Sequence, residues 1–412
     1  MRVTQNLSQL NFVSALNTLE ANVSQTQNQI STNLSFTTPS QNPVAAGAVN
    51  NYDQALAQAK QYDTNANSAQ TSLSTEDSTL SQVQTSLQSL RDIALEANSG
   101  ALSDSDRAGL AAQATQIQAG LVSLANTQDG NGQYIFGGFA TQTQPFSQSA
   151  TGSVTYNGDQ GQRQAQIAAG QYVAVADNGD AVFNQIKTGN GTFTATAGAG
   201  NTGAGVLGAS TVANPAAYDG KPFSIQFAAV PATGTVANTY NIVNAAGVTL
   251  SSGAYTGATN GQAIAYDGLQ VTLSGQPAIG DTFSVAPSTN QSVFTTVQNL
   301  ITALQGSGTT SSASNAQLSN SIAGAVNNID QALNQSSNVR AGVGARLNSI
   351  TAQLSVSSSQ QIQLQTSISS LQSLDYASAI TKLDEQTTTL QASMQAYTIT
   401  EGLSLFKYLP SG

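Results

Sequence analysis

The amino-acid sequence predicts an α+β protein in which both chain ends form a long coiled-coil-like helical bundle around a central β-rich insert. Near both ends, apolar residues recur at alternating steps of three and four, which places them in a narrow stripe along one side of a helix. Most of the 36 glycines lie between Gly130 and Gly308, where short runs alternate between apolar and polar residues. Alternation of that kind is typical of strands.

The N-terminal part of the chain predicts three helices. The first should end near Phe36, because Pro39 and Pro43 follow and disfavour helical backbone just before them. A second long helix is expected over residues 44–97. A third should begin after Ser103, whose hydroxyl suits an N-cap and is followed by carboxylates in the first turn.

The glycine-rich middle predicts strands joined by tight turns. Short alternating runs include residues 171–183, 223–227, 269–273 and 282–285. Asn-Gly and Asp-Gly dipeptides, which suit the turns of β-hairpins, lie between or beside such runs, and they begin at Asn157, Asn178, Asn190, Asp219 and Asp267.

The helical spacing returns from Ser292 and continues to the C-terminus. Residues 343–409 contain no proline and keep the three-four rhythm, apart from a phase shift of one residue near Leu374. At about 1.5 Å per residue, a continuous helix of this length would be on the order of 100 Å long. Such a rod needs a long partner, and the helices predicted at the N-terminal end are the available candidates.

These elements predict three parts. Residues 1–42 and 376–412 would be paired assembly helices, residues 43–150 and 290–375 a helical bundle domain with a β-hairpin, and residues 151–289 an outward-facing β-rich domain. The terminal helices are expected to be largely disordered in the free monomer and to fold on assembly. The predicted assembly residues are Leu7, Phe12, Leu16, Leu19, Val23, Ile30, Ile380, Leu383, Leu390, Met394, Tyr397, Leu403, Leu405 and Phe406.

Composition excludes several classes of function. Only 8% of the 412 residues are charged, the net charge is −10, and the 11 basic residues are scattered, so neither nucleic-acid nor anionic-membrane binding is expected. The chain has no cysteine and no histidine, which removes thiolate chemistry and the commonest general base and metal ligand. No apolar run approaches a membrane span, and the first residues lack the apolar core of a secretory signal peptide. The chain is therefore expected to be either cytoplasmic or exported by a route that does not read such a signal.

No motif predicts an active site, a cofactor or a metal. Residues 198–203 match G-x-G-x-x-G but continue as a glycine-rich loop, whereas a dinucleotide site needs a helix there. Residues 177–180 (DNGD) lack the spaced ligands of a calcium loop, and a hairpin turn explains them better. The adjacent carboxylates Glu76-Asp77 and Asp384-Glu385 diverge around their helices and are expected to be solvated. An enzyme is therefore not expected.

Several stretches together resemble the flagellin superfamily, and within it the hook-filament junction proteins. They are residues 1–4 (MRVT), 31–46, 124–138 (LANTQDGNGQYIFGG), 274–283 (SGQPAIGDTF), 343–348 (VGARLN), 375–376 (DY), 390–393 (LQAS) and 403–409 (LSLFKYL). The resemblance covers nearly the full chain. The chain departs from the family at Leu34, Ser35, Gln41 and Asn42, where the family usually has charged residues.

The resemblance implies a structural protein of the extracellular bacterial flagellum. Members are held by a dedicated chaperone, exported by the flagellar type III apparatus without a cleaved signal peptide, and assembled as homo-oligomers in the axial tube by their paired terminal helices. The implied partners are the first hook-associated protein on one side and flagellin on the other, with the junction acting as a template for filament growth. Low charge suits such a tube, because interface cores are depleted in charged residues.

Two other functions stay open at this point. The chain could be a flagellin, the filament subunit itself, which would dominate sheared flagella, whereas a junction protein would be a trace component. It could also be an unrelated secreted fibrous adhesin, since such proteins are also rich in Ser, Thr and Gly. An adhesin would need an export signal or an anchor that the sequence does not show.

Overall fold

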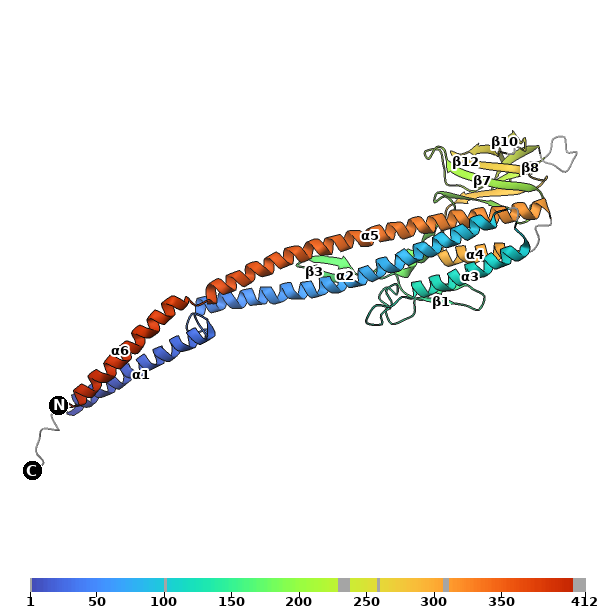
Figure 1. The fold of residues 1–412 in the computed structure, drawn as a ribbon. Helices are drawn as coiled ribbons and strands as arrows, with labels where there is room; N and C mark the ends of the chain where they lie inside the picture. The colour runs from blue at the N-terminus through green and yellow to red at the C-terminus, as the bar shows by residue number, and fades with distance from the viewer. Residues whose placement is uncertain (1, 100–101, 229–237, 258–259, 307–310, 403–412) are drawn as a thin grey trace, which may run out of the picture. The chain divides into compact units, whose positions relative to one another are not determined.

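The computed structural model describes residues 2–99, 102–228, 238–257, 260–306 and 311–402 of the chain (Figure 1). Helices at both ends of the sequence flank a β-rich middle, so the predicted α+β fold class is confirmed. The described helices are α1 (Arg2–Thr32), α2 (Pro43–Ala97), α3 (Asp104–Ala125), α4 (Val293–Gln305), α5 (Ser312–Gln372), α6 (Tyr376–Gly402) and the short π-helix η1 (Asp180–Asn184).

The chain divides into two compact units. The terminal unit comprises residues 1–64 and 352–412, and the central unit comprises residues 65–351. The long helices α2 and α5 contribute to both units. The three parts expected from the sequence have other boundaries and stay a prediction.

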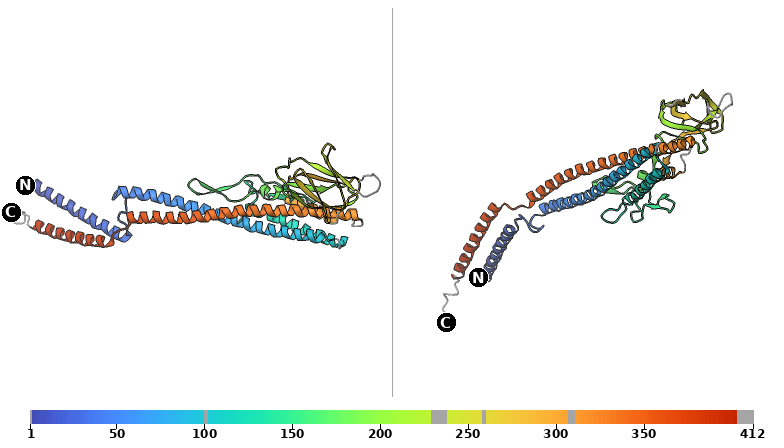
Figure 2. Two further views of the ribbon diagram at one scale, coloured as in Figure 1. Left: turned by 90° about the horizontal axis from the view of Figure 1, so that it is seen from above. Right: turned by 45° about the vertical axis from the view of Figure 1, so that its right-hand side comes forward.

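In the terminal unit, α1 lies beside α6, as both views of Figure 2 show. A small apolar cluster joins the linker after α1 to the start of α2 and the end of α5; its members are Phe36, Ala45, Ala46, Val49, Leu56 and Ile368, with Leu364 and Leu371 against them. Helix α2 begins here because Pro43 suits the first helical turn and the Asn42 side chain accepts a hydrogen bond from the Ala45 N–H at 3.1 Å.

In the central unit, α2 and α5 run antiparallel and are joined by ion pairs. Arg91 bonds Asp330 at 2.7 Å, and Arg340 bonds Asp77 at 2.9 Å. Helix α2 buries a long apolar row here, which includes Leu73, Leu80, Val83, Leu87, Leu90 and Ala94. Helix α3 begins at the predicted N-cap, because Ser103 and Asp106 form a capping box.

The central unit also holds all the described strands. The shorter ones are β1 (Phe146–Gln148), β2 (Val154–Tyr156), β3 (Gln164–Ala168), β4 (Gln171–Ala174), β5 (Ile186–Lys187) and β14 (Asn290–Gln291). They form three two-stranded antiparallel pairs: β1 with β2, β3 with β4, and β5 with β14.

Two larger antiparallel sheets share one core and form the β domain. Their strands are β6 (Phe193–Ala197), β7 (Ala204–Val212), β8 (Phe223–Ala228), β9 (Thr239–Asn244), β10 (Thr249–Ala254), β11 (Gln262–Tyr266), β12 (Leu269–Gln276) and β13 (Thr282–Pro287). The sheet orders are β10-β9-β8-β13-β6 and β11-β12-β7. Apolar side chains from both sheets, including Phe227, Leu273 and Phe283, form the shared core.

Three expectations about secondary structure need correction. Residues 343–409 do not form one rod, because α5 ends at Gln372 and α6 begins at Tyr376, where the sequence shifts phase. Residues 171–183 are strand only as far as Ala174. Asn178-Gly179 is not a hairpin turn but leads into η1. By contrast, Asp267-Gly268 does join the paired strands β11 and β12, with φ values of 51° and 73°.

The described residues contain neither a helix suited to span a membrane nor a cluster suited to hold a metal ion. None of their helices has both the length and the apolar character that crossing a bilayer requires. Nor do these residues include three or more His, Cys, Asp or Glu side chains grouped closely enough to hold a metal ion.

Candidate assembly interface

The α1–α6 pair is an antiparallel coiled coil whose seam is visible in individual contacts. Near one end, the rings of Phe12 and Tyr397 stack with their centroids 5.2 Å apart. Toward the other end, the Thr26 hydroxyl donates to the Gln386 amide oxygen at 2.8 Å. Contacting residues ascend along α1 while they descend along α6, so the two helices run in opposite directions.

On the α1 side of the seam, the least exposed positions recur at steps of three and four. Val23 and Thr26 are buried, and four other positions of the same three-four rhythm are half-buried, namely Phe12, Leu16, Leu19 and Ile30. Each lies on one stripe of the helix, as a heptad pattern requires. The stripe is apolar except at Thr26.

The α6 side of the seam differs from the apolar stripe seen in the sequence. Six of the least exposed positions along α6 step by four and three residues, and they are Ala379, Leu383, Gln386, Leu390, Ser393 and Tyr397. Every second member is therefore small or polar. Sequence reasoning missed Ala379, Gln386 and Ser393, because it selected apolar residues one position further along, at Ile380 and Met394.

Several predicted interface residues are consequently exposed within the monomer. Ile380 is 39% exposed, Met394 47% and Leu7 57%. The same helices expose further large apolar side chains that the sequence analysis did not select, namely Leu10, Val13, Tyr376 and Ile399. Apolar side chains thus remain uncovered along the pair after its own seam has formed. The predicted residues Leu403, Leu405 and Phe406 lie outside the described residues.

The end of the pair next to α2 and α5 is held by the backbone. Asn33 adopts a left-handed conformation, with φ of 58°, and its carbonyl accepts from the Leu374 N–H at 3.3 Å. Ser35 donates its N–H to the Gln372 carbonyl at 2.7 Å. Asp375 then caps α6, and its hydrogen bonds from Ser378 hold the pKa of its carboxyl below the ordinary value. The break between α5 and α6 is therefore a turn held by specific hydrogen bonds.

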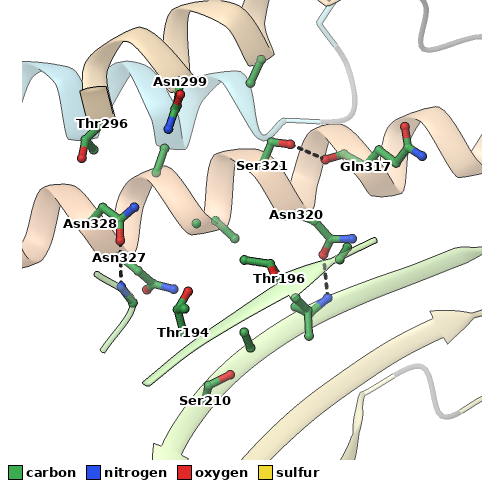
Figure 3. A pocket seen from close by; sticks show the side chains of 18 of the residues that line it. Thr194, Thr196, Ser210, Thr296, Asn299, Gln317, Asn320, Ser321, Asn327 and Asn328 are labelled. Carbon is green, nitrogen blue, oxygen red and sulfur yellow. Dashed lines mark hydrogen bonds between the residues drawn. The ribbon is translucent and has the colours of Figure 1, made fainter. Parts of the chain in front are cut away.

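A second candidate site is a cleft of about 540 Å³ in the central unit, between strands β6 and β7 and helices α4 and α5 (Figure 3). Its walls carry neutral amides and hydroxyls, and no titratable side chain is among the residues that line it. Amides of α5 bind the backbone of β7 and of the turn before β6: Asn320 accepts from the Leu207 N–H at 2.8 Å, and Asn328 accepts from the Gly189 N–H at 2.8 Å. The cleft thus attaches the β domain to α5 and has no group suited to acid–base or nucleophilic chemistry.

The G-x-G-x-x-G stretch at residues 198–203 is a loop between β6 and β7, as predicted. Two backbone N–H groups of this loop already donate hydrogen bonds within the chain. The Thr202 and Gly203 N–H groups donate to the buried Asp281 carboxylate at 2.8 and 3.0 Å, and Ala278 N–H donates to it at 2.9 Å. No helix begins at the loop, so these residues do not form a phosphate site.

Comparison with protein families places both helical ends in one family. The bacterial flagellin N-terminal helical region matches residues 3–141, and the bacterial flagellin C-terminal helical region matches residues 326–409. Flagellar hook-associated protein 3 of Salmonella typhimurium is 34% identical over 188 residues, and that of Escherichia coli is 38% identical over 160. These matches cover 46% and 39% of this chain, and 58% and 50% of the curated relatives' own lengths.

Solved structures match over a larger share of the fold. The crystal structure of Xanthomonas campestris FlgL is 33% identical with a TM-score of 0.71, and covers 77% of this chain and 99% of that one. The crystal structure of flagellar hook-associated protein 3 from Legionella pneumophila is 31% identical with a TM-score of 0.72, and covers 78% of this chain and 98% of that one. The family regions at both ends and the fold shared with these solved structures show that this chain belongs to the flagellin superfamily, in its hook-associated protein 3 (FlgL) branch.

Proposed function

We propose that this chain is a structural subunit of the bacterial flagellum that forms the junction between the first hook-associated protein and the flagellin filament. It would assemble with further copies of itself into a short zone of the axial tube and act as the template on which flagellin adds. This role comes from the names of its relatives together with the chemistry of its terminal helices. Export would use the flagellar type III apparatus and a dedicated chaperone.

The observation that carries the proposal is the uncovered apolar surface of α1 and α6. The intrachain seam uses small or polar residues at every second α6 position, which leaves Ile380, Met394 and Ile399 exposed beside it. Exposed apolar side chains gathered on one pair of helices are typical of protein–protein contacts. Hydrophobic burial scales with the apolar area removed from water, so packing these side chains against neighbouring copies would favour assembly.

The direct test places charge on the exposed positions without changing the seam. We expect Ile380→Asp combined with Met394→Asp to abolish incorporation, because two carboxylates would have to be desolvated between subunits. The matched control is Thr381→Asp combined with Gln391→Asp, which adds the same charge at exposed positions of the same helix. Electron micrographs of strains carrying only each variant, with an assay for shed flagellin in the medium, provide the measurement.

The outcomes separate the possible roles. Hooks without filaments and flagellin shed into the medium are expected for the paired Ile380 and Met394 change and for deletion of the gene, with normal filaments for the control. If the deletion instead removed flagellin itself, the chain would be the filament subunit, and unaffected filaments would leave the adhesin alternative. Normal filaments in the paired variant alone would remove these two residues from the interface.

A seam residue provides a second test of the same assignment. Leu390 is half-buried against α1, and Leu390→Asp should break the intrachain pair and therefore incorporation. The β domain has its own core and should stay folded in this variant. Filaments growing normally on Leu390→Asp would contradict the seam.

A further inference from the structure

Glu76 is a fully buried carboxyl group in the central unit. It lies on α2 with 0% of its surface exposed, and its Oε1 accepts the Asp177 N–H at 3.1 Å. Its Oε2 is buried and has no hydrogen-bond partner among the described residues. Burying a charged carboxylate without full compensation costs several kcal/mol or more, so the neutral acid is the favoured form here.

Asp177 links this carboxyl group to α5. It belongs to residues 175–179, here called the latch segment, which follow β4. Its carboxylate pairs with Arg346 and accepts from the Gln162 side chain at 2.9 Å. Val175 N–H and Gly179 N–H bind the carbonyls of Arg163 and Phe136, at 3.0 and 2.9 Å. The latch segment is thus tied to α2 through Glu76 and to α5 through Arg346.

We propose that Glu76, Asp177 and Arg346 form a proton-dependent latch, in which the protonated Glu76 carboxyl group holds the latch segment between α2 and α5. Loss of that proton places a second negative charge beside the Asp177 carboxylate, which Arg346 already neutralises. The closed latch then becomes unfavourable and the segment opens to water. The inference does not depend on the proposed flagellar function.

The electrostatics of the group support this assignment. Burial, and after it the charge of Asp177, raises the pKa of Glu76 from the ordinary value of 4.5 to about 8, while Arg346 opposes the shift. The Asp77–Arg340 ion pair also joins α2 to α5 beside the latch. This pair is partly exposed, and its two charges cancel each other, so Arg340 does not compensate a negative charge on Glu76.

The sign of the pH dependence follows from proton binding. In the closed latch Glu76 keeps its proton up to about pH 8, whereas in the opened segment it loses the proton above about pH 4.5. Opening therefore releases a proton between these limits, and its equilibrium constant should rise about tenfold per pH unit. Below about pH 4.5 and above about pH 8 both states carry the same charge, so the dependence should level off. The closed latch is therefore more stable in acid and less stable in mild alkali.

The Asp177 amide is the direct reporter, because its N–H is bound by Glu76. Hydrogen exchange measured by mass spectrometry on the full chain, in peptides spanning residues 171–183 and corrected for the intrinsic rate, should show protection falling about tenfold per unit from pH 5 to 8. In Glu76→Gln, which has nearly the shape of the protonated acid, protection should be independent of pH. Glu96→Gln, an exposed change of the same chemistry on the same helix, should behave like the wild type.

A second measurement follows the protonation of Glu76 directly in the wild-type chain. The carboxyl ¹³C shift of Glu76 in selectively labelled protein should titrate near pH 8, with Glu76→Gln used only to assign the signal. Titration near pH 4.5 would overturn the proposal. So would wild-type protection that is independent of pH, or a pH dependence that Glu76→Gln leaves unchanged.

Discussion

Asp281 is a single buried residue whose carboxylate joins two loops of the β domain. It lies in the stretch at residues 274–283 that resembles junction proteins, and its carboxylate accepts three backbone N–H groups from two loops. The side chain is 2% exposed, so its removal would leave those donors unsatisfied. The G-x-G-x-x-G loop and this motif are therefore one structural feature, although they lie far apart in the chain.

We expect Asp281→Ala to destabilise the β domain by about 2–4 kcal/mol, because hydrogen bonds to charged groups contribute more than neutral ones and their donors would stay buried. Urea unfolding followed by tyrosine near-UV circular dichroism measures the change. The control is Asp219→Ala, which removes an exposed carboxylate whose partner Lys221 is also exposed. That pair should contribute under about 1 kcal/mol. Equal effects from both changes would contradict the role of Asp281.

The Thr26–Gln386 pair places a polar contact in an otherwise mainly apolar seam. Polar pairs at such positions set the register of coiled coils at some cost in stability. We expect Thr26→Val alone to destabilise the α1–α6 pair by about 1 kcal/mol, because Gln386 loses its partner. Adding Gln386→Leu should recover most of this. A double-mutant cycle on thermal unfolding of the assembled form, in which the pair is ordered, tests the coupling, and simple additivity would show that the two side chains do not interact.

Glu76 and Asp384 show where single-residue prediction succeeds and fails. Both belong to adjacent carboxylate pairs on helices, and both were expected to be solvated. Asp384 and Glu385 are indeed exposed, because they lie between the α6 positions that are half-buried in the seam with α1. Glu76 is buried because the latch segment, 101 residues further along the chain, covers it. No local pattern in α2 signals that cover, so the sequence could not predict it.

At the scale of elements, periodicity predicted the helices well and their faces less well. The phase shift near Leu374 did mark a break, but residues 373–375 form a turn held by Asn33 and Ser35, so no continuous rod results. Along α6, the apolar stripe in the sequence passes through Ile380 and Met394, whereas the seam with α1 lies one position earlier at both points. The seam contains Ala379, Gln386 and Ser393, which hydrophobic periodicity alone does not select.

The α1–α6 pair should be the least stable helical element of the free chain. Among described side chains of these two helices, only Val23, Thr26 and Ala379 are buried, whereas α2 buries a long apolar row. Helical stability in proteins comes mainly from packing rather than propensity. We therefore keep the prediction that the pair is largely disordered in the monomer and folds on assembly. Hydrogen exchange in monomer and assembled forms measures this.

The contrary outcome is well defined. Strong protection of residues 7–30 and 380–400 in the monomer, equal to that of residues 73–94, would contradict folding on assembly. The helices would then be a preformed element, and assembly would bury their exposed side chains without ordering the chain. Residues 73–94 provide the internal control, because they pack in the central unit in both forms.

At the scale of the whole chain, the β domain is a module with its own core, and its first and last residues lie close together. The chain leaves for it after β5 and returns at β14, and these two strands pair, with Thr188 N–H donating to the Thr289 carbonyl at 2.9 Å. Its own core holds it together. Its attachment to α5 is mainly by side-chain amides such as Asn320 and Asn328, which water can satisfy equally well.

Removing this module is the strongest test of how the chain is divided. Replacing residues 189–288 with Asn-Gly, a dipeptide suited to a two-residue hairpin, should leave the helices of the central unit folded. The exposed floor of the cleft is neutral and polar, so the loss should stay near 1 kcal/mol, which corresponds to a fall in Tm of roughly 2–4 °C. Calorimetry of the shortened chain and micrographs of its filaments measure both consequences. Because the uncovered apolar side chains of α1 and α6 are untouched, assembly should persist; its loss, with the helices still folded, would give the β domain a part in the junction.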